Sequence, residues 1–355
     1  MKTGRTLQDF AAEIARQNEA KKDYLADTNR LSLLLDDDRF NIDMEQDGTS
    51  VGRLNLNDIA HRQIGEHLKI PAKYYDYMRA EFPDLLLDNV NYLFQQSPAT
   101  RMIRTLDGTA RAFLSERYRR IDNFDIAQAA LPILGEMEMD VKNSSFELTD
   151  SKMYIKMVNP RLEGEVTKGD IVQAGIMITN SETGQGSVNV QPMIFRLVCL
   201  NGMITNIGER KYHVGRGNES GENFELYRSE TLEMEDRAFM MKVQDLVQTA
   251  VDETKFDNIL ATMRQATEVP ITGRDIPKVV ELTSKEYRLR ENENEGILHH
   301  LIHGGDLSMY GLSGAITRHS QDVENYDRAT ELEAIGWSVL NMPKSRWNFI
   351  NSDVG

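Results

Sequence analysis

The sequence predicts an α+β protein in which a largely antiparallel β-sheet is preceded and followed by helices. Apolar residues recur with helical spacing near the N-terminus and again from about residue 226 to residue 340. Between residues 101 and 208 they alternate with a period of two, and short turn signals separate the runs. Strands joined by such short turns pair antiparallel, and helices before and after an antiparallel sheet define the α+β class.

The first region, residues 1–100, is expected to contain helices and one hairpin. Thr6 and Asp9 resemble a capping box at the start of the first helix. Asn57 or Asp58 can cap a later helix, and Pro71 can begin another. The segments predicted here are a helix over residues 6–35, a hairpin over 40–56, and helices from 57, from 71 and over 85–96.

The second region, residues 101–217, is expected to be a β-rich core. Asp107-Gly108 is a strong hairpin signal within Arg101–Arg120. A helix should follow from Asp122 or Asp125 to about residue 137. The further strands are predicted over residues 141–148, 153–158, 171–179, 187–200 and 204–208.

One apolar run of this core is predicted to be a buried strand that turns back at Asn201-Gly202. Its apolar members are Ile194, Leu197, Val198 and Leu200. Cys199 lies among them and is expected to be a buried structural thiol rather than a nucleophile.

The third region, residues 218–355, is expected to be acidic and helical. It carries 14 Lys+Arg against 25 Asp+Glu, whereas residues 101–217 carry 15 against 14. Helices are predicted over residues 226–266, 275–303 and 311–340. Because the chain as a whole has a net charge of -15, any basic groove should lie in the central region.

Composition excludes several classes of protein. There is no apolar run long enough to span a membrane and no apolar segment typical of a secretory signal. The single cysteine excludes an internal disulfide and a cysteine-built zinc site. A cytoplasmic protein without membrane partners is therefore expected.

Four motifs resemble a family of phage, plasmid and prophage proteins known as domain of unknown function 932. The motifs are Ile70-Pro-Ala-Lys-Tyr-Tyr75, Arg104 to Tyr118 with Asp122-Asn123, Asn180-Ser-Glu-Thr-Gly184, and Arg196-Leu-Val-Cys-Leu-Asn-Gly202. The resemblance extends from about residue 50 to residue 340. It implies a role in mobile genetic elements, and since the family has no established activity it assigns no catalytic residue.

No enzyme motif is found, so no catalytic residue and no cofactor are predicted. Neither a phosphate-binding Walker A loop nor a Gly-x-Ser-x-Gly elbow is present. His299 and His303 share one helix face, a spacing that can bind zinc. Since the usual glutamate is missing and Gly304-Gly305 ends the helix, we expect a helix-terminal histidine cluster without metal.

Arginines and aromatic residues in the core suggest a site for single-stranded nucleic acid. Cations that follow phosphates, beside rings that stack on bases, are typical of such sites. The candidates are Arg101, Arg104, Arg111, Arg117, Tyr118, Arg119, Arg120, Arg210, Lys211, Tyr212 and Arg216. The alternative is that these cations pair with the acidic helices of residues 218–355.

The expected function is binding of single-stranded DNA in recombination or replication, with strand annealing, self-assembly and no nucleotide hydrolysis. The alternative is an acidic interaction protein that binds a host factor in defence or counter-defence.

The Asn180–Gly184 segment is expected to be a turn with a structural role, since Gly184 can supply a positive φ angle. Glu182 has no obvious local partner, which leaves a ligand role open. We expect Gly184→Val to cost several times more stability than Glu182→Ala.

Overall fold

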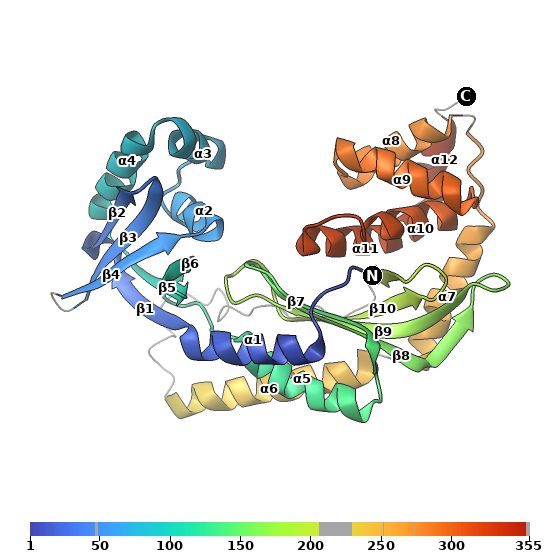
Figure 1. Cartoon of the computed structure of the whole chain (residues 1–355), viewed down its shortest axis with the longest axis horizontal. Coiled ribbons are helices and arrows are strands. Elements are labelled where there is room, and N and C mark those ends of the chain that lie inside the picture. The colour runs from blue at the N-terminus through green and yellow to red at the C-terminus, as the bar shows by residue number, and fades with distance from the viewer. Residues whose placement is uncertain (47–48, 206–228, 251, 274, 353–355) are drawn as a thin grey trace.

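The computed structural model describes residues 1–46, 49–205, 229–250, 252–273 and 275–352. It contains two β-sheets and three groups of helices (Figure 1). One sheet lies at one end of the molecule with α2, α3 and α4. The other sheet lies in the centre, between α1, α5 and α6 on one side and the C-terminal helices on the other. This arrangement confirms the predicted α+β class.

The N-terminal sheet has the strand order β1-β5-β6-β4-β3-β2, and its pairs are antiparallel except for β4 and β6. Its strands are β1 (Lys22–Asp27), β2 (Leu31–Asp36), β3 (Arg39–Gln46), β4 (Thr49–Leu56), β5 (Thr100–Leu106) and β6 (Thr109–Ser115). Asp107 and Gly108 both have positive φ angles, as a tight hairpin turn between β5 and β6 requires. Since β5 pairs with β1, strand pairing crosses the boundary predicted at residue 100.

One face of this sheet packs against three helices, α2 (Asp58–His67), α3 (Ala72–Glu81) and α4 (Pro83–Gln96). Asn57 caps α2, because its side chain accepts a hydrogen bond from the backbone N–H of Ala60. Leu86, Val90 and Phe94 follow helical spacing on α4 and are fully buried.

The central sheet is antiparallel throughout and has the order β11-β10-β9-β8-β7. Its strands are β7 (Asp140–Leu148), β8 (Met153–Glu165), β9 (Ile171–Asn180), β10 (Asn189–Arg196) and β11 (Asn201–Ile204). On one face Ile176 and Ile178 pack with α1 (Leu7–Ala20), α5 (Asn123–Glu136) and α6 (Ser229–Ala250). Val172 and Ala174 share that face of β9 and belong to the core of the C-terminal helices, whereas Met177 on the opposite face clusters with Tyr326.

The C-terminal helices form a bundle around Trp337 and Trp347, both buried. They are α7 (Glu253–Thr267), α8 (Ile276–Tyr287), α9 (Glu291–Gly304), α10 (Met309–His319), α11 (Tyr326–Leu340) and α12 (Lys344–Ser352). A fully buried ion pair, with Lys156 Nζ 2.6 Å from Glu333 Oε2, joins β8 to α11. None of the helices in the described part of the chain is long and apolar enough to cross a bilayer.

The predicted helix over residues 6–35 is wrong beyond Ala20. Thr6 caps the helix as expected, accepting from the backbone N–H of Asp9. The chain then forms β1 and β2, in which Leu31 and Leu33 alternate with Ser32 and are buried against α4. Pairing of β1 with β5 and of β2 with β3 overrides the helical propensity of this leucine-rich segment.

The strand predicted to run to Leu200 ends at Arg196, and the burial expected of its last residues is wrong. Residues 197–200 form the turn into β11, with Leu200 at a φ angle of 54°. Val198 is 64% exposed and Leu200 is 53% exposed. Cys199 lies in the same turn and is half-buried, not enclosed in a strand.

Val198→Asp is therefore expected to change the melting temperature very little, because its side chain already faces solvent. Ile194→Asp is the matched change in the same apolar run. It is expected to prevent folding, because Ile194 is 1% exposed and the new carboxylate would be buried without a partner. The soluble yield of both variants and the thermal unfolding of Val198→Asp measure the difference. A large loss for Val198→Asp would contradict the exposed turn.

Candidate functional site

Two of the arginines predicted to bind nucleic acid, Arg104 and Arg111, lie in an internal cluster. Arg104 on β5 has a fully buried side chain. Its Nε lies 2.8 Å from Asp23 Oδ1 and its Nη2 lies 2.6 Å from Asp122 Oδ1. Its Nη1 donates to the carbonyl oxygen of Glu182 at 3.1 Å. Arg104 therefore contacts β1, the start of α5 and the segment after β9 at once, and it presents no surface to a phosphate.

One carboxylate of this cluster, that of Asp122, is held in its charged form. Burial acts to raise the pKa of Asp122, but Arg104 and Lys21 outweigh it, so that the pKa lies below its usual value. Lys21 Nζ lies 2.5 Å from Asp122 Oδ2. The charges inside the protein are thus balanced by direct contacts, as buried charges must be.

Arg111 forms a further ion pair of the cluster, with Glu182. The β5–β6 register shifts after Arg104, which leaves Arg111 as the extra residue of a β-bulge. Its Nη2 contacts Glu182 Oε2, and Glu182 Oε1 accepts from the backbone N–H of Asn123 at 2.7 Å. That N–H is at the first turn of α5, where a negative charge is favourable.

The Asn180–Gly184 segment is a buried turn that completes the cluster. The Asn180 side chain is fully buried and donates to the carbonyl oxygen of Ile121 at 2.9 Å. Gly184 has a φ angle of 74°, as the sequence predicts. The partner of Glu182 that could not be found in the local sequence is Arg111, which lies 71 positions earlier.

The other predicted cations differ in exposure. Arg101 stacks on Phe113, with its guanidinium carbon 5.2 Å from the ring centroid. Arg119 contacts Asp236 of α6, and among the described residues this pair follows the predicted alternative of pairing with the acidic helices. Arg117 and Arg120 are exposed, and Arg120 Nη1 lies 3.6 Å from Asp23.

Tyr118 is partly buried and donates its hydroxyl to the carbonyl oxygen of Ser181 at 3.1 Å. The remaining predicted residues, Arg210, Lys211, Tyr212 and Arg216, lie outside the described residues.

A surface that sequence reasoning missed lies on α3 and α4. Five large side chains there are between 45% and 64% exposed: Tyr74, Tyr77, Phe82, Leu85 and Tyr92. We call this the α3–α4 surface. The ring centroids of Tyr77 and Phe82 are 5.4 Å apart, and helical spacing places Tyr74 beside Tyr77 on α3. The sequence does carry a signal for this surface. On one helix Tyr74 and Tyr77 point in other directions than Tyr75, and Tyr75 is the one that is buried.

Exposed carboxylates are interspersed with these side chains along the chain. Asp76 and Glu81 of α3 and Asp84 and Asp88 of α4 are exposed, against one exposed cation, Lys73, on these two helices. The exposed side chains of these two helices therefore combine aromatic groups with an excess of negative charge.

The Arg196–Gly202 motif forms one wall of a pocket of about 200 Å³ against α9 and α10. Arg196, Cys199 and Asn201 line it together with His300 and Arg318. Arg196 is held by Asp170 through two contacts of 2.6 Å and lies over the ring of Tyr310. The volume is below the roughly 300–1,000 Å³ of typical ligand pockets.

The fold and the site define an α+β protein with two sheets joined by buried arginine–carboxylate contacts. The family described as Domain of unknown function (DUF932) matches residues 112–341, which is more than half of the chain. The protein belongs to this family. No curated protein and no solved structure matches the chain. The matched region includes Asp122, Asn180 and Glu182 but not the α3–α4 surface.

Glu182→Ala is expected to lower the free energy of unfolding by about 3–5 kcal/mol, because it leaves Arg111 buried without its charge partner. This value replaces the expectation, drawn from the sequence alone, that Gly184→Val costs several times more stability than Glu182→Ala. Urea unfolding of Glu182→Ala and Gly184→Val compares their free energies of unfolding. Glu182→Gln is the control, because it can still accept from the backbone of Asn123 and should lose less. An unchanged urea midpoint for Glu182→Ala would contradict the cluster.

Proposed function

We propose that the protein is a non-enzymatic binding factor that docks a basic partner protein on the α3–α4 surface. The observation that supports this is the group of five apolar and aromatic side chains left exposed on two consecutive helices. Tyrosine and phenylalanine are enriched at the centres of protein interfaces, and contiguous exposed apolar patches mark interaction sites.

Charge supports a basic partner rather than a second copy of the chain. The carboxylates of Asp76, Glu81, Asp84 and Asp88 would face their own equivalents in a symmetric dimer, at a cost from like-charge repulsion. The net charge of -15 also repels a second copy and attracts a basic partner at longer range. With the mobile-element role that the family resemblance implies, the partner would be a host protein.

Tyr77 and Tyr92 are the side chains expected to contribute most. Each combines a large ring with a hydroxyl, and truncation of such interface residues commonly costs about 2 kcal/mol or more of binding free energy. The neighbouring carboxylates would chiefly raise the association rate and make it depend on salt.

A photo-crosslinking residue in place of Tyr92 tests the proposal in the host cell. The same residue in place of Val141, which is 49% exposed on β7, is the control. We expect an adduct with a basic protein from the first position alone. The purified partner should then bind the wild type, with at least roughly tenfold weaker binding to Tyr77→Ser and Tyr92→Ser at unchanged melting temperature.

Two outcomes would contradict this function. One is binding of the purified partner that survives both tyrosine substitutions and the charge reversals Asp84→Lys and Asp88→Lys. The other is a wild-type dimer that the tyrosine substitutions convert to a monomer in sedimentation, because the occupant would then be a second copy.

Single-stranded nucleic acid is the second candidate, and it is supported by Arg117 and Arg120. Both side chains are exposed in the loop between β6 and α5. Two neighbouring cations can contact successive phosphates, in the manner expected of a protein that holds a strand for annealing without nucleotide hydrolysis.

A salt titration with a labelled oligonucleotide tests this candidate. Arg117→Ala and Arg120→Ala should each reduce the slope of log affinity against log salt by about one unit. Arg30→Ala, at another exposed arginine, should leave the slope unchanged. Absence of binding by the wild type at low salt excludes the candidate and leaves the protein-binding proposal intact.

A further inference from the structure

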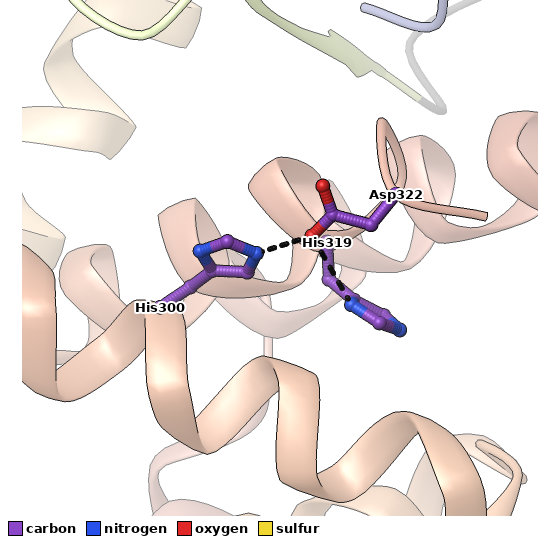
Figure 2. Close-up of side chains that lie close together, drawn as sticks. All are labelled: His300, His319 and Asp322. Atoms are coloured by element: carbon purple, nitrogen blue, oxygen red, sulfur yellow. Dashed lines mark hydrogen bonds and ion pairs between the residues drawn. The ribbon is translucent and has the colours of Figure 1, made fainter.

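Two histidines and one aspartate converge where α9 passes the end of α10. His300 projects from α9, His319 from the last turn of α10, and Asp322 from the turn that follows (Figure 2). One ligand atom from each lies within 4.8 Å of the other two. Asp322 Oδ2 is shared, since it lies 2.5 Å from His300 Nε2 and 3.7 Å from His319 Nδ1.

One ring nitrogen of His319 is not satisfied by any group of the described residues. Its Nδ1 is buried and has no hydrogen-bond partner within the described part of the chain. The distance of 3.7 Å to Asp322 Oδ2 is too long for a hydrogen bond. A buried polar atom left in this way costs free energy, so its persistence beside a carboxylate requires an explanation.

The sequence makes room for the His319 ring against α9. A Cβ at position 296 would lie 2.4 Å from two atoms of the imidazole, so only glycine at this position allows the ring to reach the helix backbone. His319 is therefore held in place between α9 and α10, with one edge toward Asp322 and His300.

Burial, with a smaller contribution from His300, lowers the pKa of His319, although Asp322 and Glu293 act in the opposite direction. The neutral imidazole carries the lone pair that binds metals. Glu293 is engaged by Arg328, and Arg318 approaches the other oxygen of Asp322 at 3.9 Å, which leaves Oδ2 facing the histidines.

We propose that His300, His319 and Asp322 bind a divalent transition-metal ion, with Zn²⁺ as the preferred ion. Two imidazoles and a carboxylate are a ligand set of zinc sites, and three protein ligands leave a position for water or another ligand. Zinc–ligand bonds of about 2.0–2.2 Å place two ligands of a tetrahedral ion roughly 3.3 Å apart. The distances from Asp322 Oδ2 to His300 Nε2 and to His319 Nδ1, 2.5 Å and 3.7 Å, lie on either side of that value.

The site differs from the His299–His303 pair suggested by sequence spacing, although those rings lie 4.2 Å apart. His300 also lines the pocket formed by the Arg196–Gly202 motif. A metal at this site would thus join α9 to the end of α10 and place its open position near the pocket. This inference goes beyond partner binding and does not depend on it.

Isothermal titration of the chelator-treated full chain with ZnCl₂ tests the proposal. We expect one equivalent to bind and to raise the melting temperature, because the ion binds the folded state. His300→Ala, His319→Ala and Asp322→Ala should each weaken binding by at least roughly tenfold to a hundredfold. His303→Ala is the control, since it removes an exposed histidine from the same helix and should bind as the wild type does.

X-ray absorption of the zinc-loaded wild type keeps the proposal testable if a variant fails to fold. Two imidazoles with oxygen ligands are expected, without sulfur from Cys199. The proposal is overturned by absence of stoichiometric binding, by sulfur in the first shell, or by binding that depends on His303 and survives His319→Ala.

Discussion

The burial of Arg104 is the constraint on which the arrangement of the two sheets depends. Its guanidinium contacts Asp23 of the N-terminal sheet, Asp122 at the start of α5 and the carbonyl oxygen of Glu182 after β9. An unpaired guanidinium at this depth would cost several kcal/mol, so the three elements must meet for the arginine to be buried. The buried charge therefore favours one relative position of the sheets over others that would satisfy apolar packing alone.

The same contacts explain why the arginine-rich hairpin is compatible with an acidic protein. Arg104 and Arg111 are balanced inside by Asp23, Asp122 and Glu182, and they contribute little to the outer surface. The surface is left to the carboxylates, including those around α3 and α4. A cluster that secures the fold and an outer surface that can bind a partner are thus separate parts of the molecule.

The polar side chains near the end of α10 are paired differently from those of the arginine cluster. Here polar side chains gather without complete pairing, since the buried Nδ1 of His319 has no hydrogen-bond partner among the described residues. In the arginine cluster each buried charge has a partner of opposite sign. Arg111 Nε and Asn180 Oδ1 of the arginine cluster are also buried without a hydrogen-bond partner among the described residues, so the candidate ligand site is distinguished by the convergence of two imidazoles on one carboxylate.

The sequence by itself determined the class of the fold, the family and many helix and strand positions, because periodicity and turn chemistry are local. The Asp107-Gly108 hairpin and the caps at Thr6 and Asn57 follow from neighbouring residues. Only the tertiary structure decided that the segment after Ala20 forms strands and that Val198 faces solvent, since pairing and burial depend on distant segments. Only the tertiary structure likewise decided which carboxylates pair with Arg104 and Arg111. A charge pattern shows where cations are concentrated, but their accessibility depends on carboxylates that the fold brings from other parts of the chain.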